Sequence, residues 1–100
     1  MDKQELKGNI TLVFEEDAHR SAAYADGTQI GECEFSPSGD VWTITHTGVR
    51  PSHEGRGIAG KLVRKVIEEA RARKRKIRPV CSYAQKMMNG KEEYKDVLSE

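Results

Sequence analysis

The chain has 100 residues, which suits one small domain with a single hydrophobic core, so residues 1–100 are expected to form a single domain. Hydrophobic residues make up 36% and charged residues 33%, too polar for a membrane protein and too apolar for a disordered chain. No apolar run approaches the roughly 18–20 residues of a membrane-spanning helix, and the acidic start differs from a signal peptide. A soluble cytoplasmic protein is therefore expected.

The net charge of +1 conceals an asymmetry along the chain. Residues 56–78 hold ten basic and two acidic side chains, a net charge of +8, which leaves −7 for the remainder. Such a basic segment is suited to an anionic ligand.

Alternating apolar residues predict an antiparallel sheet in the first half of the chain. Four strands are expected, at residues 9–14, 21–25, 28–35 and 41–49. The Asp26-Gly27 pair is typical of a tight hairpin turn between the second strand and the third. Because strands joined by short turns usually neighbour one another, we expect the four to form a meander.

The apolar period then changes to that of a helix. Apolar residues recur at spacings of three and four between charged ones, which predicts an amphipathic helix over residues 57–73. Its expected buried face consists of Ile58, Ala59, Leu62, Val63, Val66, Ile67 and Ala70. Residues 77–81 should form a fifth strand, parallel to the fourth because a helix separates the two. One or two short helices, at residues 83–88 and 92–98, complete a mixed α+β fold.

The junction between the fourth strand and the long helix is a candidate phosphate site. Gly55 and Gly57 let the backbone turn tightly and approach a ligand. The first turn of a helix has unpaired N–H groups and the positive end of the dipole, which favour phosphate. Arg56 and Lys61 add positive charge nearby. The alternative is a loop that needs its glycines only for turning.

Residues 55–60 read Gly-Arg-Gly-Ile-Ala-Gly and so match the dinucleotide-binding pattern G-x-G-x-x-G. That fold would need a parallel strand at the start of the chain and an acidic residue about twenty positions further on. Here the pattern follows antiparallel strands, and the later residues are Arg73-Lys74-Arg75-Lys76. A dinucleotide-binding fold is therefore disfavoured.

The same junction resembles the GNAT acyltransferase superfamily, whose Q/R-x-x-G-x-G/A segment opens the helix after the fourth strand. Residues 54–59, Glu-Gly-Arg-Gly-Ile-Ala, match it except that Glu54 replaces Gln or Arg. More closely, the chain resembles the minimal GNAT-like proteins of the YjdJ/NATD1 type. The shared segments are His46-Thr47-Gly48-Val49, residues 54–59, Pro79-Val80-Cys81-Ser82-Tyr83 and Glu93-Tyr94-Lys95-Asp96-Val97.

This resemblance implies a GNAT-like fold, in which the fourth and fifth strands splay apart into a V that binds acetyl-CoA. Backbone groups of Thr47, Gly48 and Val49 would pair with the pantetheine arm. Backbone amides between Gly55 and Gly60 would hold the pyrophosphate. The full set of implied cofactor-binding residues is Thr47, Gly48, Val49, Glu54, Gly55, Arg56, Gly57, Ile58, Ala59, Gly60 and Lys61.

Cys81 and His46 are the candidate catalytic residues. Cys81 ends the predicted fifth strand, where it could accept the acetyl group covalently, or it is a small core residue. Its spacing from Cys33 fits neither a disulfide scaffold nor a metal site, so no metal is expected. His46 shares strand parity with Trp42 and Ile44, which would place it near the cleft as a general base, or as a hydrogen-bonded core histidine.

Two tyrosines, Tyr83 and Tyr94, are candidate proton donors to the departing thiolate, or else structural residues. His53 precedes the glycines and is expected to be solvated, and the basic run over residues 71–76 to be a solvated helix end.

The sequence thus predicts an acetyl-CoA-dependent N-acetyltransferase whose amine acceptor is a small molecule or a protein. The alternative is a non-catalytic CoA-binding module, because so short a chain leaves little room for substrate recognition. Nucleic-acid binding is disfavoured because no aromatic residues interleave with the basic ones. No membrane partner is expected, and the oligomeric state is expected to be a monomer or a weak dimer.

Overall fold

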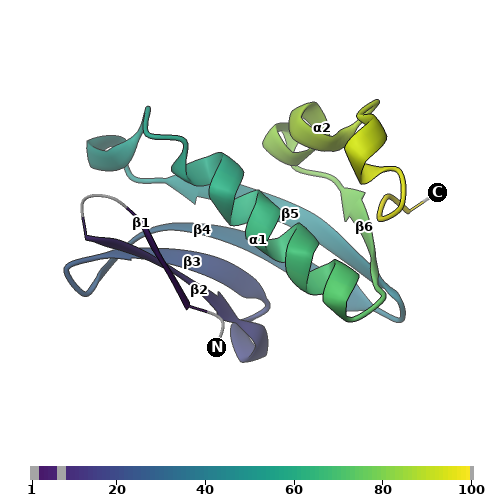
Figure 1. Cartoon of the computed structure of the whole chain (residues 1–100), viewed down its shortest axis with the longest axis horizontal. Helices are drawn as coiled ribbons and strands as arrows, with labels where there is room; N and C mark the ends of the chain where they lie inside the picture. Colours follow the sequence, from purple (N-terminus) through teal and green to yellow (C-terminus); the bar gives the residue numbers. More distant parts are fainter. Residues whose placement is uncertain (1–2, 7–8, 100) are drawn as a thin grey trace.

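The computed structural model describes residues 3–6 and 9–99, which form a six-stranded sheet in sequential order with a long helix across it (Figure 1). The strands are β1 (Lys3–Leu6), β2 (Ile10–Glu15), β3 (Arg20–Ala25), β4 (Thr28–Ser38), β5 (Val41–Val49) and β6 (Lys76–Pro79). The helices are α1 (Ile58–Ala72) and α2 (Ser82–Met88), with 3₁₀ turns at Glu16–Ala18, Pro51–His53 and Glu92–Tyr94.

The predicted meander is confirmed, because β2 to β5 pair antiparallel in sequence order. Asp26 and Gly27 both have positive φ, 50° and 82°, as the predicted tight hairpin turn requires. An additional edge strand, β1, pairs antiparallel with β2. It was missed because its sequence, Lys-Gln-Glu-Leu, has no apolar alternation.

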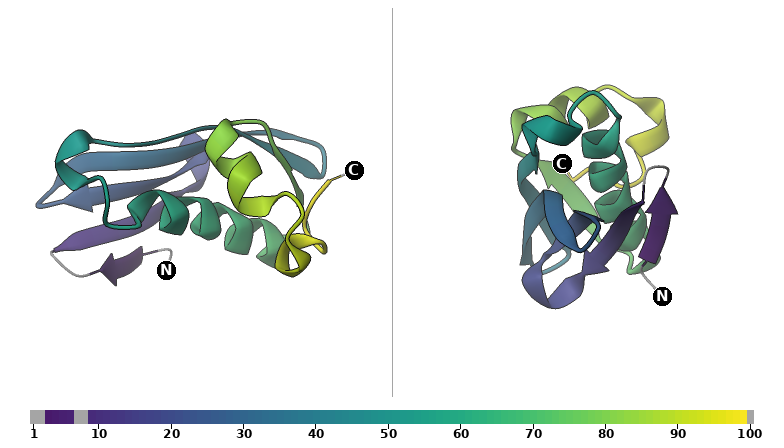
Figure 2. Two further views of the ribbon diagram at one scale, coloured as in Figure 1. Left: turned by 90° about the horizontal axis from the view of Figure 1, so that it is seen from above. Right: turned by 90° about the vertical axis from the view of Figure 1, so that its left-hand side faces the viewer.

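The second half of the chain builds the predicted crossover. The strand β6 pairs parallel with β5, but only from Val41 opposite Lys76 to Ile44 opposite Pro79. Beyond Ile44, β5 runs on to Val49 while the chain turns away from it into α2. The opening that the resemblance implied beside the fourth strand therefore lies beyond Ile44, where the chain leaves the sheet for α2 (Figure 2).

Two C-terminal boundaries differ from the prediction. Cys81 lies beyond the strand, as the residue that caps α2, because Pro79 ends the pairing with β5. Val80 and Cys81 both donate their backbone N–H to the carbonyl of Ile44 as the chain leaves the sheet. The expected helix over residues 92–98 is only a 3₁₀ turn at Glu92–Tyr94.

The core lies between α1 and one face of the sheet. All but one of the predicted helix residues are fully buried there: Ile58, Leu62, Val63, Val66, Ile67 and Ala70. Ala84 and Met88 of α2 join the same cluster. At the far end of α1, the rings of Phe35 and Trp42 stack with their centroids 4.2 Å apart, and Phe14 stacks against both.

Arg73 covers this aromatic stack from the end of α1. Its guanidinium lies 5.0 Å from the Phe14 ring centroid and 5.9 Å from that of Trp42, and it is ion-paired with Glu69 and Glu16. Arg73→Ala should therefore lower the free energy of unfolding by about 1–2 kcal/mol, measured by urea denaturation. Arg78→Ala removes an exposed arginine of β6 and should change the free energy of unfolding by less than about 0.5 kcal/mol. Equal losses in the two variants would contradict this role.

Within the described part of the chain, no helix is both long and apolar enough to cross a bilayer.

Candidate functional site

A groove runs along the free edge of β5 to the start of α1. Since β6 ends at Pro79, no strand of the described chain pairs with β5 past Ile44 on that side, which leaves backbone N–H and C=O groups available. The groove has a volume of about 400 Å³. It is lined by Thr47, Gly48, Val49, His53, Glu54, Gly55, Gly57, Ile58, Ala59 and Tyr83, and is called the helix-side groove below.

The glycines of the junction adopt the backbone that only glycine takes easily. Gly55 has φ +81° and Gly57, the N-cap of α1, has φ +75°. A Cβ on either would meet nothing within 4 Å, so both face open space. The first-turn N–H groups of α1 lie just beyond Gly57, where a helix has no partners of its own for them. This end of the groove is suited to an anion.

Most of the predicted cofactor residues therefore come together, and the exceptions are Arg56, Gly60 and Lys61. The side chains of Arg56 and Lys61 are exposed. Gly60 contributes indirectly, because a Cβ there would lie 3.2 Å from the hydroxyl of Tyr83. That close approach lets Tyr83 reach from α2 to the first turn of α1.

The structure separates the two candidate tyrosines. Tyr83 lines the groove and is 40% exposed. Tyr94 is buried beneath the guanidinium of Arg71, whose distance to the ring centroid is 5.7 Å. Only Tyr83 is therefore placed where it could act on a ligand. His53, expected to be solvated, also lines the groove, and its Nδ1 lies 2.8 Å from the Ser52 hydroxyl.

Thr47 connects the groove to both cysteines. Its Oγ1 lies 3.5 Å from Sγ of Cys81 and donates to Sγ of Cys33 at 3.6 Å. Cys81 is partly exposed, and its Sγ also accepts the backbone N–H of Ala84 at 3.3 Å. Cys33 is fully buried, and that burial raises the pKa of its thiol to about 12. The two thiols are therefore chemically distinct.

This difference predicts selective alkylation. With its pKa raised to about 12, Cys33 has only about one part in 10⁴ as thiolate at pH 8, and its burial also blocks reagents. Iodoacetamide should therefore modify Cys81 at least about 100-fold faster than Cys33 in the folded protein. Peptide mass spectrometry measures the two rates, and urea-unfolded protein serves as the control in which both react. Equal rates in the folded protein would contradict the placement of Cys33.

The expectation that His46 shares a face with Trp42 and Ile44 is wrong. Glu34 pairs with His46 while Phe35 pairs with Ile44, so Thr45 is an extra residue that forms a β-bulge in β5. The bulge reverses the alternation, which turns Thr47 toward the core and His46 toward the opposite face of the sheet. His46 is accordingly exposed, whereas Trp42 and Ile44 are buried.

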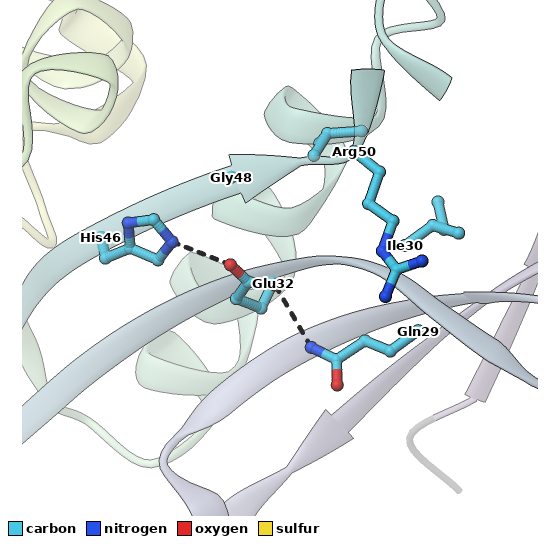
Figure 3. Close-up of a pocket in the computed structure, with 7 residues that line it drawn as sticks. Gln29, Ile30, Glu32, His46, Gly48 and Arg50 are labelled. Atoms are coloured by element: carbon cyan, nitrogen blue, oxygen red, sulfur yellow. Dashed lines mark hydrogen bonds and ion pairs between the residues drawn. The ribbon is translucent and has the colours of Figure 1, made fainter. Parts of the chain in front are cut away.

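His46 lies in a second groove, on the face of the sheet away from α1 (Figure 3). Its Nε2 is 2.8 Å from a carboxylate oxygen of Glu32, and the other oxygen accepts the amide of Gln29 at 3.2 Å. This outer groove, about 450 Å³ in volume, is lined by Gln29, Ile30, Glu32, His46, Gly48, Val49 and Arg50. Because Gly48 and Val49 line both grooves, these meet at one segment of β5.

The His46–Glu32 pair packs closely against Gly48. A Cβ at Gly48 would lie 3.1 Å from Nε2 of His46 and 3.2 Å from the Glu32 carboxylate, so these side chains would have to shift by a few tenths of an ångström. Glu32, Gln29 and Arg50 were not identified from the sequence. Recognising them required the antiparallel register that sets Glu32 opposite Gly48.

Much of the basic run at residues 71–76 is paired rather than simply solvated. Arg71, Arg73 and Arg75 form ion pairs with Asp96, Glu69 and Glu16, and Asp40, respectively. The Arg71 guanidinium holds the pKa of the Asp96 carboxyl below its usual value by hydrogen bonding to it. The run therefore ties the end of α1 to its neighbours. Across residues 3–6 and 9–99, no group of three His, Cys, Asp or Glu side chains is placed to hold a metal ion.

A family model described as GCN5-related N-acetyl-transferase matches residues 20–97. A search of curated proteins finds no match. Among solved structures, a GCN5-like protein from Staphylococcus aureus is 24% identical with a TM-score of 0.62, covering 97% of this chain and 86% of its own.

Two further structures contain acetyl-CoA. A GNAT family acetyltransferase from Brucella melitensis in complex with acetyl-CoA is 23% identical over 72% of this chain and 54% of its own, with a TM-score of 0.57. A predicted acetyltransferase from Clostridium acetobutylicum with acetyl-CoA is 19% identical over 92% of this chain and 64% of its own, with a TM-score of 0.54. The chain thus spans less than two thirds of both these relatives.

Proposed function

The chain belongs to the GCN5-related N-acetyltransferase family, and from that premise we propose that it is an acetyl-CoA-dependent N-acetyltransferase acting on an amine. The observation that carries the proposal is the helix-side groove, which joins the unpaired edge of β5 to the glycine N-terminus of α1. A long ligand with a polar arm and a phosphate group at one end fits this arrangement of backbone donors. The same proposal includes two finer points. The chain is a minimal GNAT-like protein of the YjdJ/NATD1 type, and its 100 residues form a single domain.

In this proposal, Thr47, Gly48 and Val49 pair through their backbone with the pantetheine arm of acetyl-CoA. Backbone amides from Gly55 to Gly60 hold its pyrophosphate, with Arg56 and Lys61 adding positive charge from the exposed side. The open space beyond Gly55 and Gly57 supports this fit, because side chains there would occupy the groove. Acetyl-CoA would supply the acetyl group as a thioester and leave as the free thiol.

Cys81 is proposed to accept the acetyl group first. Its thiolate forms a bond to the acetyl carbon as the bond to the CoA sulfur breaks, and the departing sulfur takes up the proton that Cys81 gave up. Tyr83, which lines the groove, is proposed to pass on that proton. The Ala84 N–H supports the thiolate of Cys81 as a hydrogen-bond donor.

His46 is proposed to act on the acceptor from the other face of β5. Because Nε2 of His46 donates to the Glu32 carboxylate, Nδ1 is its basic nitrogen. Nδ1 takes a proton from the ammonium group of the acceptor, and Glu32 stabilises the resulting imidazolium. The neutral amine then forms a C–N bond to the acetyl carbon. Cys81 leaves as a thiolate and recovers a proton from the amine nitrogen. Overall, one ammonium and one thioester become one amide, one free thiol and one proton.

The test is saturable binding of acetyl-CoA by calorimetry, followed by amine-dependent release of free CoA thiol. Binding together with thiol release and an acetylated amine supports the proposal. Lack of binding would overturn it. A protein that binds acetyl-CoA but neither becomes acetylated nor acetylates an amine would instead be a CoA-binding module.

The free thiols of Cys33 and Cys81 support a reducing, cytoplasmic location as part of the proposal.

A further inference from the structure

We propose that the amine acceptor is a small molecule that also carries a carboxylate, and that the outer groove binds it between Glu32 and Arg50. This inference rests on the proposed function, since it names the substrate class of the same site. Its starting point is that this groove contains both an acidic and a basic side chain that do not pair with each other.

Glu32 supplies the end of the groove that would bind the ammonium. One carboxylate oxygen is held by His46 at 2.8 Å and the other by the amide of Gln29 at 3.2 Å. The Glu32 side chain is only 26% exposed, so its position is restricted by these contacts. A carboxylate can accept several hydrogen bonds, so this one retains capacity for an ammonium donor. The same contact would bring the amine beside His46.

Arg50 supplies the opposite charge. Its backbone N–H donates to the carbonyl of Ile30 at 2.8 Å, which anchors the residue at the end of β5. Within the described part of the chain, its guanidinium forms no ion pair or hydrogen bond. Figure 3 shows this guanidinium and the imidazole of His46 on opposite sides of Glu32. Arg50 therefore faces the groove with its donors unused.

Four arginines, Arg20, Arg71, Arg73 and Arg75, are each paired with a carboxylate. Of the arginines without an ion pair in the described part of the chain, which also include Arg56, Arg64 and Arg78, Arg50 is the one that lines the outer groove. Arg50 shares a groove with the carboxylate of Glu32 and remains unpaired, with about 450 Å³ between the lining residues. A planar guanidinium binds a carboxylate through two parallel hydrogen bonds. A ligand with an ammonium and a carboxylate would complement both groups at once.

The position of the outer groove, like its charges, suits an amine acceptor. Gly48 and Val49 line both grooves, so an amine held at Glu32 lies across one segment of β5 from the helix-side groove. A ligand anchored at Arg50 through its carboxylate would keep its amine directed toward that segment. Arg50 would thus select substrates by charge, whereas His46 and Glu32 act on the amine.

The experiment compares amino acids with their carboxamides, which keep the amine and remove the anion. The probes are alanine, β-alanine and 4-aminobutyrate, each with its amide, titrated into the protein without acetyl-CoA and followed by backbone NMR shifts. The amino acid of best-fitting length should bind about 10- to 100-fold more tightly than its amide, with shifts at Gln29, Glu32 and Arg50. Arg50→Gln should remove this preference, because it weakens binding of the amino acid and leaves binding of the amide unchanged. The matched control Arg78→Gln, on exposed β6, should retain it.

The results separate this inference from the proposed function. Three results would each overturn the inference. The protein could show no preference for the amino acid, the preference could survive in Arg50→Gln, or the NMR shifts could lie outside the outer groove. Because the titration contains no acetyl-CoA, its result stands even where acetyl-CoA binding fails. Turnover gives the second readout: Arg50→Gln should raise KM for the acid, leaving KM for the amide within about twofold. If the protein acetylates the amino acids and their amides equally well, the proposed function stands and this inference is overturned.

Discussion

Replacing Gly57 with valine is expected to weaken acetyl-CoA binding by at least about 100-fold, since two or more charge-assisted hydrogen bonds to the pyrophosphate would be lost. Gly57 caps α1 with φ +75°, and a Cβ there would project into open space at the end of the helix-side groove. The valine side chain would therefore occupy the place proposed for the pyrophosphate. Calorimetric titration with acetyl-CoA measures the loss.

A matched control removes the effect of backbone strain. Gly27 has φ +82° and open space beyond its Cβ position, as Gly57 does, but it lies in the hairpin between β3 and β4. Gly27→Val should cost about 1–2 kcal/mol of stability, similar to Gly57→Val, and leave acetyl-CoA affinity unchanged. Wild-type affinity in Gly57→Val, or equal losses of affinity in both variants, would remove Gly57 from the pyrophosphate site.

Incubation with acetyl-CoA is expected to place one acetyl group on Cys81, and Cys81→Ser should abolish this labelling. The serine hydroxyl can still cap α2 by accepting the Ala84 N–H, so the fold should be preserved. A hydroxyl without an activating base is a far weaker nucleophile than a thiolate. Turnover should accordingly fall by at least about 1000-fold, with acetyl-CoA affinity within about threefold of the wild type.

Cys33→Ala provides the control, and intact-mass spectrometry with peptide mapping provides the measurement. Cys33 is buried with its pKa raised to about 12, so it remains a thiol and should take no part in the reaction. Its variant should still be acetylated at Cys81. If Cys81→Ser turns over at the wild-type rate, transfer is direct from acetyl-CoA to the amine, with His46 or proximity as its basis.

The fold was predictable to a large extent because its signals are local. The period of the apolar residues identified α1 and its buried face, and the Asp26-Gly27 turn identified the hairpin between β3 and β4. The GNAT resemblance, and with it the acyltransferase class, is confirmed by the family model over residues 20–97. The edge strand β1 was missed because its four residues carry no periodic apolar signal.

The candidate site was predictable only on its helix side. The glycine segment is continuous in the sequence, so Gly55 and Gly57 could be assigned to the junction directly. The outer groove combines β4 and β5, and its members Glu32 and Arg50 have no local feature that distinguishes them from other surface residues. The roles proposed for Cys81 and His46 stay predictions until the variants are measured.

The sequence by itself therefore determined the order of the elements, the glycine junction before α1 and the family, because each depends on residues close together in the chain. Only the tertiary structure decided which face His46 occupies. The single extra residue of the bulge at Thr45 reverses the strand alternation, and its presence depends on how β5 pairs with β4. Register across two strands likewise placed Glu32 opposite Gly48 and left Arg50 unpaired in the same groove. Pairing between distant segments leaves no pattern in the neighbouring residues, so the outer groove could emerge only from the folded chain.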